Sequence, residues 1–455
     1  MTVSNEIHLD DELEGEIPFL PPYPKAVDIG KVEEENHSNV KVLAFIRNHT
    51  GECLAFHFTD DGIERDIKIT QEIFGVITQY GNDFDVMRFT LHNMTSGGIK
   101  VQVMSLGAAL VGVIAPDRKG VYKDVVLGFD SVNTYYSPLN PGFGRVTSLC
   151  PLPYNLEKVV WDWDFDRDEG SVTFSTTFYR IDLILSVKYS LNVCNEIIVD
   201  LKASGSKIVP ISLTSQVYWN MAGHSKGEEA LRHHVLSINS DTIWKHYNHK
   251  LKNFYPVRQT VLDFRQPTIM DNDEVFGDKK FEHVFVVTKG CEEKVAFVAR
   301  LIHPRTCRYV EIFTDQPWVL CNTLNKLPRK DWDLDICSED DDMNYGECSE
   351  DDTSDLDPCA SDGKDSDDDQ NDELEEIPGK YNSVYRKYGS FCVTPLSDLT
   401  GFDPILRSSK PYSHRIIYKL GVYKRYMKRT KKSTTQDEED KEEGQGDGIT
   451  DIKDE

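Results

Sequence analysis

Between about residues 40 and 330 the sequence repeatedly alternates apolar and polar side chains. The clearest alternating runs are residues 99–103, 172–176, 181–189 and 197–201. Turn-forming residues punctuate these runs at 96–98, 168–170 and 192–195. Successive strand side chains point to opposite faces, so this period of two predicts strands that each bury one face. No stretch of helical period stands out, and we expect an all-β fold, a large antiparallel β-sandwich.

The negative charge of the chain is concentrated in one segment. The chain of 455 residues carries 51 Lys and Arg against 77 Asp and Glu, a net charge of −26, and 331–378 contain 22 of the acidic residues but a single basic one, Lys364. Such a segment cannot bury enough apolar surface to fold, and we predict a disordered acidic insert. The acidity also argues against a nucleic-acid partner.

These patterns divide the chain into five parts. We expect a flexible N-terminal arm at 1–38, a β-sandwich at 39–330, the acidic insert at 331–378, returning strands of the same sandwich at 379–423, and a basic run with an acidic disordered tail at 424–455. Alternation resumes after the insert, which therefore interrupts one domain and does not separate two.

The sequence also limits the compartment and the cofactors. Neither an apolar signal segment near the N-terminus nor an apolar run long enough for a membrane helix is present, so we expect a cytoplasmic protein without a membrane partner. The basic run at 424–432, KRYMKRTKK, leaves a nuclear location open, although the run could instead pair with the acidic segments of the chain itself. The ten cysteines form no Cys-x-x-Cys pair, and we expect no metal and no cofactor.

Several blocks of the chain, in order, resemble the aldose 1-epimerases (galactose mutarotases). The blocks are Pro116–Gly120, Asp124–Asp130, Gly144–Val146, Leu213–Gly223, Leu262–Arg265 and Thr314–Pro317. The resemblance covers roughly 74–330 and 381–420, and it implies a β-sandwich of the galactose mutarotase type that binds a hexose in an open cleft.

Mutarotation needs an acid for the ring oxygen and a base for the anomeric hydroxyl, both with pKa values near the working pH. The resemblance implies a His as the acid in the block Leu213–Gly223, where this chain has Gln216. It implies a Glu as the base in a C-terminal block, where this chain has Thr394. A carboxamide does not titrate, and a threonine hydroxyl is no base near neutral pH. We therefore predict a catalytically impaired member, a pseudoenzyme.

Other family positions are partly retained. The resemblance implies that Arg145, Gln216, Tyr218 and Asp263 form the sugar-binding set, although an ion pair could also explain Arg145 or Asp263. Tyr218 and Trp219 are more readily explained as core aromatics than as platforms for a sugar. A Gln that contacts sugar in the family is replaced by Leu320. His224 is a candidate substitute acid, but it lies beyond Gly223 and we expect it to be exposed.

Two alternatives to a sugar-binding pseudoenzyme stay open. One is an active aldose 1-epimerase that interconverts hexose anomers with displaced residues. The other is a scaffold with a vestigial pocket, whose acidic insert recruits a protein partner. Three serines in the insert, Ser338, Ser349 and Ser366, each precede three acidic residues and could be phosphorylated, although a solubilising loop explains the same composition.

Overall fold

The computed structural model describes residues 66–79, 81–150, 152–247, 251–276, 281–290, 293–328, 374–397, 405–407 and 411–423, and the strand backbones at 40–47 and 53–59. The described strands belong to one compact unit that ends at Tyr423. The predicted arm, most of the acidic insert with its three serines, the basic run and the predicted tail lie outside the described residues.

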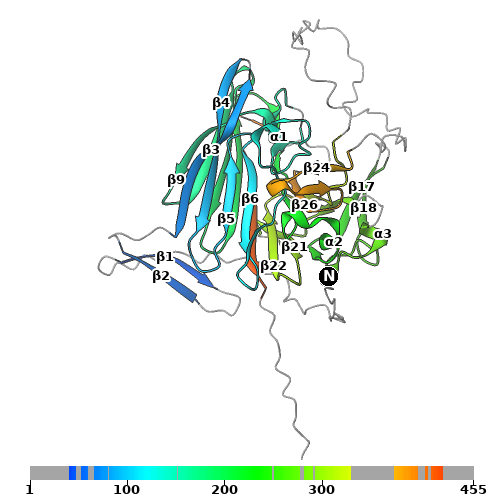
Figure 1. The fold of residues 1–455 in the computed structure, drawn as a ribbon. Coiled ribbons are helices and arrows are strands. Elements are labelled where there is room, and N and C mark those ends of the chain that lie inside the picture. The colour runs from blue at the N-terminus through cyan, green and yellow to red at the C-terminus, as the bar shows by residue number, and fades with distance from the viewer. Residues whose placement is uncertain are drawn as a thin grey trace, which may run out of the picture. The chain divides into compact units, whose positions relative to one another are not determined.

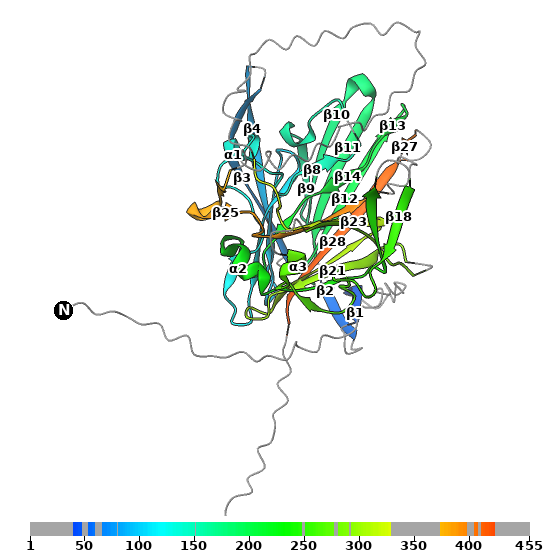
Figure 2. The same ribbon diagram turned by 90° about the vertical axis from the view of Figure 1, so that its right-hand side faces the viewer.

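Three sheets, of nine, six and five strands, make up most of the described fold (Figure 1). The five-stranded sheet has the strand order β3 (Ile67–Gln79), β4 (Asn82–Asn93), β5 (Lys100–Met104), β6 (Ala109–Pro116) and β7 (Tyr122–Asp124). The nine-stranded sheet has the order β19 (Thr268–Ile269), β16 (Val235–Ile238), β21 (Ala296–Ile302), β22 (Arg308–Thr314), β28 (Tyr412–Val422), β12 (Glu196–Gly205), β11 (Leu183–Leu191), β10 (Ser171–Phe178) and β9 (Asp162–Asp166). Figure 2 shows β10, β11, β12 and β28 of this sheet.

A six-stranded sheet carries strands from both sides of the acidic insert. Its order is β15 (Tyr218–Trp219), β26 (Phe391–Leu396), β23 (Trp318–Asn322), β20 (Glu282–Val286), β17 (Thr242–Tyr247) and β18 (Leu251–Pro256). Two-stranded sheets pair β1 (Val40–Arg47) with β2 (Cys53–Thr59), β13 (Val209–Pro210) with β27 (Ile405–Leu406), β14 (Leu213–Ser215) with β8 (Val146–Ser148), and β24 (Glu376–Pro378) with β25 (Val384–Arg386).

The described helices are short. The α-helices are α1 (Val132–Tyr136), α2 (Gly227–Arg232) and α3 (Asp273–Phe276), and the 3₁₀ turns are η1 (Leu156–Lys158), η2 (Tyr179–Ile181), η3 (His224–Lys226) and η6 (Lys380–Asn382). None of the described helices is long and apolar enough to span a bilayer.

The alternating residues form one core between the five-stranded and nine-stranded sheets. Phe89 and Val113 from the first sheet and Phe174 and Val187 from the second are fully buried members of the same cluster. The hydroxyl of Tyr189, on the second sheet, donates a hydrogen bond across the core to a backbone carbonyl before β6, at 2.7 Å. All described strand pairs around this core are antiparallel, which confirms the predicted antiparallel β-sandwich.

The structure corrects two predicted boundaries. Ile181 does not begin a strand, because it ends the turn η2 and Asp182 follows with a left-handed φ of 48° before β11 starts. The insert was predicted to extend to 378, but 376–378 form β24, in which Ile377 is buried. The backbone N–H of Leu374 donates to the carbonyl of Pro328 at 2.8 Å, so the chain leaves and re-enters the domain at one point.

Candidate functional site

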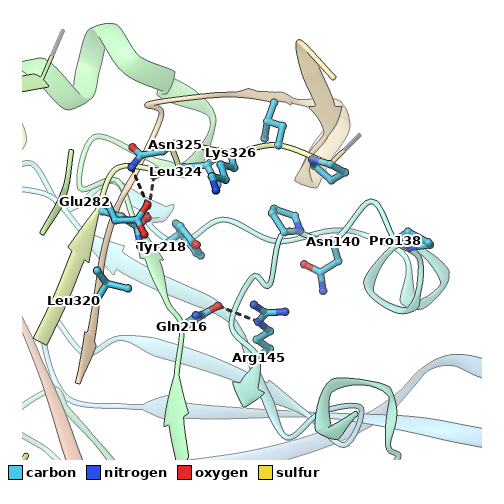
Figure 3. A pocket seen from close by; sticks show the side chains of 14 residues that line it. Pro138, Asn140, Arg145, Gln216, Tyr218, Glu282, Leu320, Leu324, Asn325 and Lys326 are labelled. Carbon is cyan, nitrogen blue, oxygen red and sulfur yellow. Dashed lines mark hydrogen bonds between the residues drawn. The ribbon is translucent and has the colours of Figure 1, made fainter. Parts of the chain in front are cut away.

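A cavity of about 370 Å³ opens where the six-stranded sheet meets the loop between α1 and β8 (Figure 3). Its size falls within the range of about 300–1,000 Å³ that is usual for small-ligand sites. The lining side chains are Pro138, Asn140, Pro141, Arg145, Gln216, Tyr218, Glu282, Leu320, Asn322, Leu324, Asn325, Lys326, Leu327 and Pro328. Three of the four predicted sugar-binding residues, Arg145, Gln216 and Tyr218, therefore lie at one cavity.

Arg145 and Gln216 face the cavity from adjacent strand ends. The backbone N–H of Gln216 donates to the carbonyl of Arg145 at 3.0 Å, just beyond the paired strands β8 and β14. Their side chains also meet, because Arg145 Nε donates to Gln216 Oε1 at 2.9 Å. Arg145 Nη1 additionally donates to both carboxylate oxygens of Glu157, at 2.6 and 2.7 Å. The guanidinium thus belongs to an ion pair, as one of the sequence interpretations allowed.

The loop that carries Arg145 is held rigidly. Asn140 Oδ1 accepts hydrogen bonds from the backbone N–H groups of Gly142 and Phe143, both at 2.9 Å. Gly144 adopts a φ of +67°, and a Cβ atom there would lie 1.8 Å from the carbonyl oxygen of Leu110. Only glycine fits this backbone approach, so the Gly-Arg pair presents its arginine from a fixed position.

The neighbouring residues Tyr218 and Trp219 have different surroundings: Trp219 lies in the core, and Tyr218 lies at the cavity. Trp219 is fully buried and packs against Tyr418 of the nine-stranded sheet, with ring centroids 5.2 Å apart. Tyr218 lines the cavity with little of its surface exposed and packs edge-on against Phe143 at 5.4 Å. Burial raises the pKa of the Tyr218 phenol far above neutrality. Tyr218 can therefore contact a ligand but cannot exchange a proton with it at neutral pH.

Thr394 lies beside the cavity floor without reaching it. It is opposite Leu320 in the pairing of β26 with β23, and directly opposite residues of an antiparallel pair share a face. Leu320 lines the cavity, whereas Thr394 is fully buried and its hydroxyl lies 3.5 Å from the sulfur of Cys392. The position that the resemblance assigns to the base thus holds a fully buried hydroxyl that contacts the thiol of Cys392.

Asp263 does not line the cavity. Its two carboxylate oxygens accept hydrogen bonds from Arg265 Nε and Nη2, both at 2.8 Å, and these bonds lower the pKa of Asp263. Arg265 in turn contacts Asp241 at 3.0 Å. The structure therefore places Asp263 in an ion-pair network away from the three residues that it was predicted to join.

His224 is buried, contrary to the expected exposure, with 8% of its surface accessible. The η3 turn packs it against Tyr385, whose hydroxyl lies 2.9 Å from His224 Nδ1. Burial, with a smaller effect of the nearby Lys380 charge, lowers the pKa of His224 to about 4. Because His224 does not line the cavity, it is no substitute acid there.

Two charged residues in the cavity were not found by sequence reasoning. Glu282, the first residue of β20, is exposed and lines the wall, and its carboxylate accepts a hydrogen bond from Asn325 at 3.4 Å. Lys326 lines the same wall from the segment after β23. No histidine is among the lining residues, and no three His, Cys, Asp or Glu side chains of the described part of the chain could together hold a metal ion.

Comparison with known proteins gives a consistent result. The family model described as aldose 1-epimerase matches residues 156–347. Galactose mutarotase of Mus musculus is 26% identical over 305 residues, which cover 57% of this chain and 83% of the relative. Aldose 1-epimerase of Streptococcus thermophilus is 23% identical over 299 residues, which cover 57% and 83%.

Solved structures match in fold. An aldose epimerase homologue from C. elegans aligns with a TM-score of 0.53 at 16% identity, over 72% of this chain and 97% of its own. Galactose 1-epimerase from Lactobacillus acidophilus aligns with a TM-score of 0.52 at 14% identity, over 78% and 99%. Gln216 and Asp263 fall within the segment that the family model matches, whereas Arg145 and Thr394 lie outside it.

Proposed function

Because this chain belongs to the aldose 1-epimerase family, we propose that its cavity binds a hexose or a related sugar without efficient mutarotation. The observation that carries the proposal is the meeting of Arg145, Gln216 and Tyr218 around one cavity of about 370 Å³. Since arginine only donates, it holds the acceptor oxygen of Gln216, and the amide nitrogen of Gln216 remains available to a ligand hydroxyl.

The impaired chemistry follows from the groups at the two catalytic positions. Gln216 cannot supply a proton, and Thr394 is fully buried opposite the lining residue Leu320, with a hydroxyl that does not ionise near neutrality. Each missing general acid or base typically removes about 10²–10⁴-fold of rate. Sugar recognition can persist without these groups, because hydrogen bonds to hydroxyls and apolar contact require no titration.

Titration calorimetry with galactose and glucose tests the binding. We expect saturable binding that Gln216→Ala weakens about fivefold to tenfold, the loss typical of one or two hydrogen bonds. Gln71→Ala, an exposed glutamine on β3, is the matched control and should leave the affinity unchanged. Absence of sugar binding to the native chain would favour a scaffold with a vestigial pocket.

The second candidate is an active epimerase with displaced residues, and Glu282 is the observation that favours it. This carboxylate faces the cavity and makes no ion pair among the described residues. It could act as a base, but no histidine lines the cavity to complete the pair as its acid. A mutarotation rate that depends on Glu282 would favour this candidate.

A further inference from the structure

The ion pair between Arg145 and Glu157 occupies part of the guanidinium group that an anionic ligand would use. Arginine binds a phosphate or a carboxylate most strongly through two parallel N–H donors. Any such pair includes either Nε or Nη1 of the guanidinium. Here Nε donates to Gln216, and Nη1 donates to both oxygens of Glu157. With Nε committed to Gln216 and its charge compensated by Glu157, Arg145 can offer a bound anion only its remaining N–H groups, beside a carboxylate that repels the anion.

Glu157 is fixed in this position by its own surroundings. It lies in the turn η1, where the side chain of Asn155 accepts the backbone N–H of Glu157 at 3.2 Å. Gly107 adopts a φ of +64°, and a Cβ atom there would lie only 3.1 Å from the Glu157 backbone. The side chains of Arg145 and Glu157 are 27% and 24% exposed, so the pair is only partly screened by water.

The ion pair also decides the charge of the cavity. The charged lining residues are Arg145, Lys326 and Glu282. Without Glu157 these three would leave one excess positive charge facing a ligand. With Glu157 bound to Arg145, the remaining Lys326 and Glu282 balance one another.

We propose that Glu157 sets the ligand class of this cavity: by holding Arg145 in an ion pair, it favours uncharged sugars over sugars that carry a phosphate or a carboxylate. Glu157 is thus a positioning residue that acts through Arg145, and it does not itself line the cavity. This inference rests on the proposed sugar binding and adds the residue that determines specificity.

Calorimetric titration with three related ligands tests the proposal. Galactose is uncharged, galacturonate carries a carboxylate, and galactose 6-phosphate carries a phosphate. The native chain should bind both anions at least about tenfold more weakly than galactose. Glu157→Gln should strengthen binding of both anions by about tenfold, the effect of one uncompensated charge at short range, and change galactose affinity by less than about twofold. Glu169→Gln, which removes one charge from an exposed turn paired with Lys188, is the matched control and should change none of the affinities.

The possible outcomes separate the two proposals. If galactose does not bind the native chain, the proposed function is overturned and this inference with it. If galactose binds but the ratio of anion to galactose affinity is the same in the native chain and in Glu157→Gln, only the role of Glu157 is overturned. Should circular dichroism show that Glu157→Gln is unfolded, Glu157→Ala decides by the same ratio, because a smaller side chain fits this partly exposed site.

Discussion

Lys380→Met should destabilise the fold strongly, because Lys380 joins the chain after the acidic insert to the five-stranded sheet. Its side chain is buried, and Nζ lies 2.5 Å from Asp124 Oδ2 and 2.8 Å from the carbonyl oxygen of Val111. Asp124 is also buried, and its other oxygen accepts backbone N–H groups of Val113 and Val126 at 3.1 and 3.2 Å. Removal of the ammonium group leaves this carboxylate without its counter-charge.

The expected loss can be estimated from these contacts. Removal of one partner from a buried ion pair typically costs about 3–5 kcal/mol of the free energy of unfolding. Because Asp124 keeps two backbone hydrogen bonds, we expect the lower end, about 3 kcal/mol. Asp124→Asn should cost a similar amount, since it leaves the buried ammonium group of Lys380 without its counter-charge. The double variant should cost much less than the sum, with a coupling energy of about 2–3 kcal/mol.

Equilibrium unfolding in urea, followed by tryptophan fluorescence, measures these free energies. Lys188→Met removes a cation from an exposed pair with Glu169 and is the matched control, with an expected loss below about 1 kcal/mol. If Lys380→Met also costs less than about 1 kcal/mol, or if the two single losses simply add, then this buried pair does not anchor the returning segment.

Two further predictions concern the backbone and the pH dependence. Gly144→Ala should cost at least about 3 kcal/mol of unfolding free energy, because the added Cβ would overlap the Leu110 carbonyl. Gly120 has a similar φ but open space around it, so Gly120→Ala should cost only about 1 kcal/mol. The urea midpoints of the two variants measure this difference. Burial, and then the nearby His303, lower the pKa of His234 to about 3. The unfolded state therefore binds more protons below about pH 6.5, and stability should fall as the pH drops from there, by up to about 1.4 kcal/mol per pH unit for this group. His234→Gln should flatten that slope more than the exposed His233→Gln does, because His233 acts on His234 only as a minor charge, and equal slopes in both variants would contradict this assignment.

The fold was largely predictable from sequence because burial of one strand face imposes a period of two on the residues. Leu183, Leu185, Val187 and Tyr189 alternate in the sequence, and all four are buried in β11. The limits of elements were less predictable. Ile181 continues the same alternation, yet the left-handed Asp182 turns the chain before the strand begins.

The site was predictable only where a local motif carries it. The block around Gln216 and the Gly-Arg pair at Arg145 have recognisable spacing, and the structure brings both to the cavity. Glu157 and Glu282 are single carboxylates without a motif; Glu157 reaches Arg145 through the turn η1, and Glu282 reaches the cavity from a strand far along the chain. His224 follows a glycine that suggests a surface turn, but packing against Tyr385 buries it.

The central claim, a sugar-binding cavity without efficient proton transfer, is tested most directly by polarimetry of freshly dissolved α-galactose with saturable binding verified in the same sample. We predict that the first-order rate constant of mutarotation stays at its spontaneous value as the protein concentration is raised. A rate constant that rises in proportion to protein concentration, and that Glu282→Gln abolishes, would contradict the account and show a working epimerase with a displaced base.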